Sequence, residues 1–231
     1  MNMPKIYLSP AAHGRDNPCR YDSACGENIH CNLYIDELEP YLLACGFAVK
    51  RNPKDRTGDR LKEAIAESNA WGADLHYVAH TNAGGGAYSL LMVYDQGTAY
   101  GYAEKLAARR REIYAGNVKI SVQPQWDELR LTAAPAVYDE MVFHDNAKDI
   151  AWFHEHLREM AEATAKAICD MFGAAFVDPY AKPAEPAPEP ESGGDVWYRV
   201  QVGAFREKAN ADRLCAELQG KGYAAFVKAG A

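Results

Sequence analysis

The chain has 231 residues, of which 48% are hydrophobic, and its formal net charge is −7 at pH 7. That size suits one domain of ordinary dimensions with a small addition. The acidic balance, with a pI near 5.5, argues against nucleic acid as the main partner. The chain contains no uninterrupted run of about 18 apolar residues, so the sequence predicts no membrane span.

Predicted strands and helices alternate along the first three quarters of the chain. The predicted strands are residues 5–10, 47–51, 75–79, 89–94 and 136–143. The predicted helices are residues 27–45, 59–71 and 98–115, and a last one that begins near residue 145 and runs to residue 172. Residues 116–134 fit no regular element beyond a short strand. This alternation predicts an α/β fold with an open, mostly parallel twisted sheet and helices on both faces.

Composition divides the chain into three predicted parts. Residues 1–173 carry a charge of −6, residues 174–195 carry −4 and residues 196–231 carry +3, which sum to the net −7. The middle part alternates prolines with acids, a composition that resists packing and predicts a linker. The last part predicts a β-α-β unit with a strand, a helix over residues 208–221 and a second strand. Such a unit is too small to bury a good core alone.

Two histidines follow predicted strands, and a glutamate opens the first predicted helix. His13 and His80 each stand after an apolar run, and Glu27 follows a polar loop. In open α/β sheets, sites gather outside the carboxyl ends of the strands. Two imidazoles and one carboxylate are the ligands of a catalytic zinc site that keeps one position open. The pattern therefore predicts a site for one Zn2+, although a lone histidine at a strand end is more often structural than a ligand.

Two further residues bear on this site. Glu140 lies in an otherwise apolar strand at the same predicted sheet edge. Partial burial beside a metal would suit it to work first as a general base and then as a general acid. His76 precedes His80 by an even offset on the same strand, so it shares a face with His80 and is a reserve ligand.

The six cysteines are interpreted as free thiols. Cys19, Cys25 and Cys31 are evenly spaced, but no CxxC pair is present. The amino-terminal residues lack the apolar region of a signal peptide, so synthesis in the cytoplasm and reduced thiols are expected. A disulfide between Cys19 and Cys25 is the alternative.

The motifs over residues 5–172 resemble those of zinc-dependent N-acetylmuramoyl-L-alanine amidases found in cell-wall autolysins and phage endolysins. Residues 9–14 match a strand followed by a His-Gly loop, and Glu27-Asn28 matches the ligand glutamate that opens the first helix. Residues 80–83 match His-x-Asn-(Ala/Ser). Residues 135–146 match Pro-x-(Val/Leu)-x-x-Glu-x-x-Phe-x-x-Asn, with Asp149 soon after.

The resemblance implies the zinc ligands His13, Glu27 and His80 and the catalytic residue Glu140. One departure is visible in the first motif. The family usually has Asp-x-Gly-His-Gly there, whereas this chain has Ser9-Pro10-Ala11-Ala12-His13-Gly14 and lacks the acid and one glycine. In the family this acid contacts the metal ligands and not the metal itself. Its loss is therefore expected to change the metal affinity or the orientation of the ligand imidazole.

The tail resembles a SPOR module, which in its family binds peptidoglycan glycan strands stripped of stem peptides. The match lies in residues 198–205, 210–214 and 222–226, and it covers only the first of the two usual halves of such a module. A tail that binds nothing is the alternative.

Together, these resemblances imply a peptidoglycan hydrolase. It would cleave the amide between N-acetylmuramic acid and L-alanine of the stem peptide, and bacterial peptidoglycan would be its partner. Action on the wall after release, as a phage endolysin, or in a spore or mother-cell context, as an autolysin, is the expected setting. The alternatives are a non-catalytic cell-wall binding protein with a degenerate amidase domain, and a zinc peptidase or deacetylase.

Overall fold

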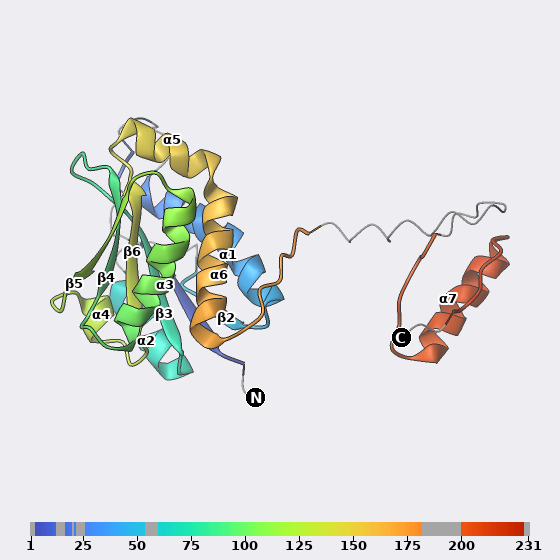
Figure 1. Cartoon of the computed structure of the whole chain (residues 1–231). Helices are drawn as coiled ribbons and strands as arrows, with labels where there is room; N and C mark the ends of the chain where they lie inside the picture. Colours follow the sequence, from blue (N-terminus) through green and yellow to red (C-terminus); the bar gives the residue numbers. More distant parts are fainter. Residues whose placement is uncertain are drawn as a thin grey trace. The chain divides into compact units, whose positions relative to one another are not determined.

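The computed structural model describes residues 3–12, 17–19, 21, 26–53, 60–181 and 200–228. The chain forms two compact units, Met1–Pro183 and Ala184–Ala231 (Figure 1). His13, Cys25 and residues 182–199, which include most of the predicted linker, lie outside the described residues.

A six-stranded sheet forms the centre of the first unit, in the order β2-β1-β3-β6-β4-β5 (Figure 1). The strands are β1 (Lys5–Pro10), β2 (Ala48–Arg51), β3 (Leu75–Asn82), β4 (Tyr88–Val93), β5 (Asn117–Val122) and β6 (Ala136–Phe143). Strands β2, β1, β3 and β6 are parallel to one another. Strand β4 is antiparallel to β6 and parallel to β5. The mostly parallel α/β sheet expected from the sequence is therefore confirmed.

Helices cover both faces of this sheet, as predicted. The helices of the first unit are α1 (Glu27–Ala44), α2 (Leu61–Trp71), α3 (Thr98–Ile113), α4 (Asp127–Arg130), α5 (Ala147–Glu155) and α6 (Leu157–Phe172). The larger core cluster joins one face of β1 and β3 to α1, α3 and α6. On the other face, the Tyr7 hydroxyl donates to Glu67 of α2, and Leu129 of α4 packs against Tyr138.

Strand alternation decides which side chains face α2 and α4. In β3, Tyr77 and Ala79 belong to the larger core cluster, so His76, Val78 and His80 point to the opposite face. In β6, Tyr138 faces α4 in the same way, and Glu140 follows it on that face. The predicted functional residues of β3 and β6 therefore share one face of the sheet.

Two predictions about the first unit are corrected. Residues 117–122, expected to be irregular or a short strand, form the edge strand β5 along the whole of β4. The alternation of Val118 and Ile120 with polar residues is the strand pattern behind this pairing. The single last helix is two helices, because the backbone of His156 has φ −115° and ψ 18° and interrupts the helical path. Helix α5 lies over the ends of the strands, while α6 runs beside the sheet (Figure 1).

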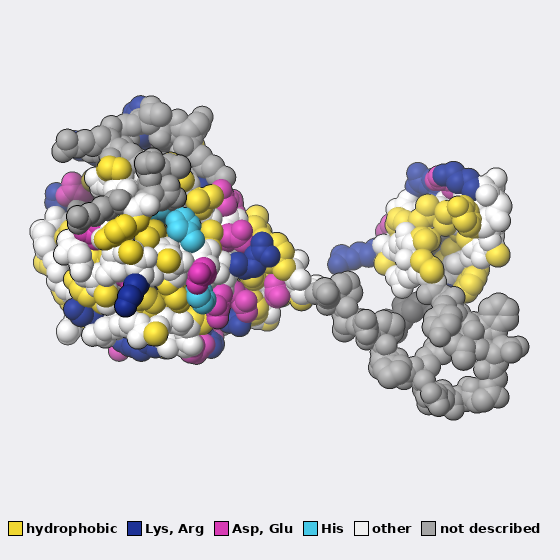
Figure 2. Space-filling model, turned by 90° about the horizontal axis from the view of Figure 1, so that it is seen from above, with side chains coloured by type: hydrophobic (Ala, Val, Ile, Leu, Met, Phe, Trp, Pro, Cys, Tyr) yellow, Lys and Arg dark blue, Asp and Glu magenta, His cyan; other side chains and the backbone are white. Residues whose placement is uncertain are grey.

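The second unit contains the predicted helix, α7 (Lys208–Gly220), but the predicted β-α-β arrangement is not found in its described residues. Residues 200–205 and 223–228 were expected to be strands and have no strand pairing. These segments bury little apolar surface, since Val200 is 87% and Phe226 68% exposed, so burial does not support strand pairing there. Hydrophobic side chains gather on a face of this unit (Figure 2).

Two other features bear on the predictions. Residues 174–181, assigned to the linker from sequence, lie against the first unit, where Phe176 stacks on Tyr41 of α1. In the described part of the chain, no helix combines the length and the apolar character needed to cross a bilayer.

Candidate active site

Glu27 and His80, two of the predicted metal ligands, are in contact at the carboxyl ends of the parallel strands. Glu27 begins α1 and His80 lies near the end of β3, and both are buried. Nδ1 of His80 is 2.9 Å from Oε1 of Glu27. Figure 2 shows this end of the first unit from above, where histidine and acidic side chains lie among hydrophobic ones.

The carboxylate of Glu27 is held in place from both sides. The backbone N–H of Thr81 donates to Oε1 at 3.2 Å, and Nδ2 of Asn17 donates to Oε2 at 2.6 Å. Because both oxygens accept from fixed donors, the carboxylate has a defined orientation toward the His80 imidazole.

Glu140 lies beside His80 on the neighbouring strand. The register of β3 and β6 pairs His80 with Glu140, and the two side chains point to the same face. Glu140 is 8% exposed, so it keeps a narrow opening toward solvent. The register shifts just after this pair, between His80 and Asn82. Such irregularities re-aim side chains at the ends of strands.

Aromatic rings form the floor of the site. The Tyr138 ring centroid is 4.4 Å from that of His80 and 5.0 Å from that of Trp126. Burial, and then the negative charge of Glu140, Glu128 and Glu27, raises the pKa of Tyr138 well above its usual value. The phenol therefore remains neutral at ordinary pH, and the apolar floor is preserved.

A buried thiol close to Glu27 reports the same electrostatic environment. Burial, and then the charge of Glu27, raises the pKa of Cys31 well above its usual value. Glu27 adds negative charge to both shifts, and it is this charge, rather than the burial, that favours a bound cation.

The donor atoms fit a zinc ion as far as the described residues extend. Ligands about 2.0–2.2 Å from a tetrahedral zinc ion lie about 3.3–3.6 Å from each other. Nδ1 of His80 and Oε1 of Glu27 are in hydrogen-bond contact at 2.9 Å, so the two atoms face one another, and an imidazole with a carboxylate is a zinc donor pair. Among the described residues, no group of three or more His, Cys, Asp or Glu is placed to hold a metal. The third predicted ligand, His13, is not among them.

His76, the reserve ligand, belongs to a different cluster. Its Nε2 lies 3.1 Å from Oε1 of Glu128, and its ring stacks on Tyr7 with the centroids 5.3 Å apart. Sharing a face with His80 therefore does not bring it to the same site.

Glu128 is a buried acid that sequence reasoning missed. It is 3% exposed, and its Oε1 accepts a 2.5 Å hydrogen bond from Oγ of Ser9. A carboxylate thus reaches Ser9, which lies in the first motif, where the acid of the resembled family is missing. Its segment was expected to be irregular, and nothing local in the sequence pairs Glu128 with a residue 119 positions away.

A cavity of about 180 Å3 opens on the same face of the sheet. Its walls include Ser9, Asn52, Trp126, Glu128 and Tyr138. Tyr138 therefore contacts both this cavity and His80, which places the two side by side. The residues that line the cavity include two acids and no lysine or arginine.

A glycine loop borders the site where β3 turns into β4. Gly84 and Gly85 have φ of +119° and +72°, and Oδ2 of Asp145 accepts from both of their amides, at 2.8 and 2.9 Å. A Cβ on Gly86 would lie 2.4 Å from the Phe143 ring, so only glycine fits there. The loop is therefore pinned over the end of β6.

Comparisons with known proteins agree with this fold and with the motifs. The model of the SPOR domain family matches residues 162–229. N-acetylmuramoyl-L-alanine amidase CwlM of Bacillus licheniformis is 30% identical over 182 residues, covering 74% of this chain and 64% of the relative. The sporulation-specific N-acetylmuramoyl-L-alanine amidase of Bacillus subtilis (strain 168) is 28% identical, covering 97% of this chain and 84% of the relative.

Solved structures show the same architecture. The N-acetylmuramoyl-L-alanine amidase AmiC2 of Nostoc punctiforme superposes with a TM-score of 0.65 at 15% identity, over 74% of this chain and 97% of that one. An N-acetylmuramoyl-L-alanine amidase of Clostridium difficile 630 gives 0.65 at 14% identity, over 75% and 98%. At these identities the likeness shows the fold. The resemblance to these amidases and the SPOR match, both expected from the sequence, are confirmed.

Proposed function

We propose that this chain is a member of the N-acetylmuramoyl-L-alanine amidases that it resembles, and that it hydrolyses bacterial peptidoglycan. The bond cleaved is the amide between the lactyl group of N-acetylmuramic acid and L-alanine of the stem peptide. The observation that carries this proposal is the meeting of Glu27, His80 and Glu140 at the carboxyl edge of the sheet. The sequence similarity to CwlM supports it.

One zinc ion is assigned to His13, Glu27 and His80. A zinc ion bound there would act as a Lewis acid toward the amide carbonyl and lower the pKa of a coordinated water. The contribution of this chain is to orient the donors. Thr81 and Asn17 hold the carboxylate of Glu27, and Tyr138 supports the imidazole of His80.

Glu140 is assigned the proton transfers. Its carboxylate takes a proton from the attacking water as a general base, and then delivers a proton to the alanine nitrogen, because an amine is a far better leaving group than its anion. Its position opposite His80 puts it next to the assigned metal site. Burial on the strand keeps bulk water from competing for that proton.

The cavity lined by Trp126, Glu128 and Tyr138 is assigned to the stem peptide, since it adjoins the His80 side of the site. The pinned glycine loop is assigned to the rim of the groove that holds the substrate. The SPOR-like tail is assigned to binding glycan strands, and its positive charge of +3 suits an anionic polymer such as the wall. Action after release as an endolysin or autolysin is part of this proposal.

Product analysis tests the proposal directly. Purified peptidoglycan is digested with the full chain, with and without a chelator, and the products are identified by mass spectrometry. Free stem peptides beginning with L-alanine, lost on chelation and restored by zinc, are expected. A zinc peptidase or deacetylase would yield different new ends, and intact muropeptides on walls from several bacteria would favour a binding protein without catalysis.

A further inference from the structure

Two free thiols lie together at the far ends of α1 and α6. Cys45 is the residue directly after α1, and Cys169 lies in the last turn of α6. Both helices belong to the same core cluster and cover the same face of the sheet. Cys45 is half-buried, whereas Cys169 is 2% exposed.

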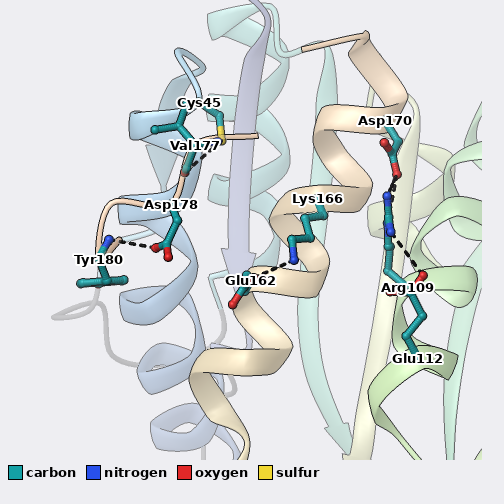
Figure 3. Close-up of polar contacts among 9 residues, drawn as sticks. All are labelled: Cys45, Arg109, Glu112, Glu162, Lys166, Asp170, Val177, Asp178 and Tyr180. Atoms are coloured by element: carbon teal, nitrogen blue, oxygen red, sulfur yellow. Dashed lines mark hydrogen bonds and ion pairs between the residues drawn. The ribbon is translucent and has the colours of Figure 1, made fainter. Parts of the chain in front are cut away.

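The same short segment contacts both thiols. Sγ of Cys45 accepts from the backbone N–H of Val177 at 3.2 Å and donates to its carbonyl oxygen at 3.6 Å (Figure 3). Sγ of Cys169 donates to the carbonyl oxygen of Ala175 at 3.9 Å. The two sulfurs therefore lie side by side beneath residues 175–177.

The electrostatics of Cys169 are also those of a thiol that lies near Cys45. Burial, and then a hydrogen bond with the Cys45 thiol, raises the pKa of Cys169 to about 12. Cys169 is therefore protonated at ordinary pH, and it is also buried. Cys45 is the more exposed of the two residues, so its thiol reacts first with an oxidant.

The segment over the pair is held by its own contacts. Phe176 and Tyr180 both pack on Tyr41 of α1, with ring centroids 5.9 and 5.4 Å apart. Oδ1 of Asp178 accepts from the backbone N–H of Tyr180 at 2.8 Å (Figure 3). These contacts hold residues 175–177 over the two sulfurs. Cys45 lies at the end of α1, where the backbone can adjust to the formation of a disulfide bond.

We propose that Cys45 and Cys169 are a redox modification site, which forms an intramolecular disulfide when the protein meets a small-molecule disulfide such as oxidised glutathione. The Cys45 thiolate attacks one sulfur of the oxidant, releases one thiol and leaves a mixed disulfide. The Cys169 sulfur then attacks Cys45 Sγ, the bond from Cys45 to the oxidant breaks, and the departing thiolate takes up the Cys169 proton and leaves as the second thiol. The two protein thiols lose two electrons, and the oxidant is reduced to two thiols.

The disulfide would join the ends of α1 and α6 and close a loop that contains most of the residues of the first unit. Closing so long a loop removes conformational freedom from the unfolded chain and so stabilises the folded one. The expected rise in Tm is about 5–10 °C for a unit of this size. This inference does not rest on peptidoglycan hydrolysis.

The test uses the full chain, reduced, purified and then incubated with oxidised glutathione. The intact mass should fall by two hydrogen atoms, and a non-reducing digest should contain one peptide pair joining Cys45 to Cys169. Oxidised protein should melt about 5–10 °C above reduced protein. Cys45→Ser should remove both the cross-link and the shift, whereas Cys215→Ser, in the second unit, should retain both.

Three outcomes overturn the proposal. These are failure of the wild-type chain to form the cross-linked pair, a bond that links Cys45 or Cys169 to another cysteine, and an unchanged Tm after oxidation. Since the wild-type chain supplies each of these readouts, a misfolded variant does not obscure them. Circular dichroism checks the fold of Cys45→Ser.

Discussion

Nδ1 of His80 lies 2.9 Å from Oε1 of Glu27, although the two residues are 53 positions apart. One comes from the end of a parallel strand and the other from the first turn of a helix, so their contact depends on β3 and α1 meeting at one edge of the sheet. The same edge holds Glu140, which pairs with His80 in the register of β3 and β6.

Replacing Glu140 by Gln should lower turnover of peptidoglycan by about 10²–10⁴-fold, because the amide cannot carry the proton. Zinc content and the unfolding midpoint should stay near those of the wild-type chain, since Gln is nearly isosteric with Glu. Release of stem peptides and metal analysis of the same preparation measure both. Turnover that survives the change would remove Glu140 from the mechanism.

Replacing Asn17 by Ala should weaken zinc binding about 10–100-fold, because Nδ2 of Asn17 orients the Glu27 carboxylate from 2.6 Å. Competition with a chromogenic zinc chelator measures this affinity without reference to catalysis. Asn210→Ala, at an exposed position of α7, is the matched control and should bind zinc as the wild type does. Equal affinity in both variants would contradict the role given to Asn17.

Replacing Trp126 by Ala should raise KM for peptidoglycan more than it lowers kcat. Trp126 lines the cavity and contacts Tyr138. The hydrogen bonds of Glu27 and His80 given above do not involve Trp126. Loss of an aromatic wall removes binding that the substrate and the transition state share. Steady-state kinetics on soluble muropeptides separate the two constants, and a fall in kcat alone would place Trp126 in the chemistry instead.

Replacing Arg110 by Met should lower the free energy of unfolding by about 3–5 kcal/mol, because Asp139 would be left as a buried charge without its cation. The guanidinium Nη2 is 2.8 Å from Oδ2 of Asp139, and the two side chains are 3% and 0% exposed. Urea denaturation measures the loss. The double variant Arg110→Met/Asp139→Leu should recover part of it, and a single variant as stable as the wild type would refute the assignment.

Stability should fall at alkaline pH. Burial raises the pKa of Tyr34 to about 12, against about 10 in the unfolded chain. Below pH 10 both states keep the proton, so the contribution is complete. Between about pH 10 and 12 the unfolded state loses the proton first, so the free energy of unfolding falls by about 1.4 kcal/mol per pH unit for this group.

Urea denaturation at a series of pH values from 8 to 12 measures this slope. Tyr34→Phe should make the slope shallower, although it also removes the hydrogen bonds with Thr164 and Tyr77 and lowers stability overall. An equally steep slope in the variant would show that other groups cause it. Tyr77, whose pKa burial raises well above its usual value, should contribute in the same direction.

The sequence predicted the α/β fold, five of the six strands as strands and the sheet edge where His80 and Glu140 lie. These features depend on local information. Apolar runs mark strands, helical spacing marks helices, and a glycine after a helix marks its end, as at Gly72 with φ +68°. The motifs around Glu27, His80 and Glu140 are equally local, so the family resemblance was readable before the fold was known.

Only the tertiary structure decided the partners of these residues. Strand order and register place Glu140 opposite His80, direct Glu128 of α4 to Ser9, and bring Arg110 to Asp139. The tertiary structure also decided that β5 lies at the edge of the sheet and that the segments on either side of α7 form no strand pairs. The physical reason is that these contacts join residues far apart in the chain. Their energies depend on which faces are buried against each other, and no local pattern encodes that choice.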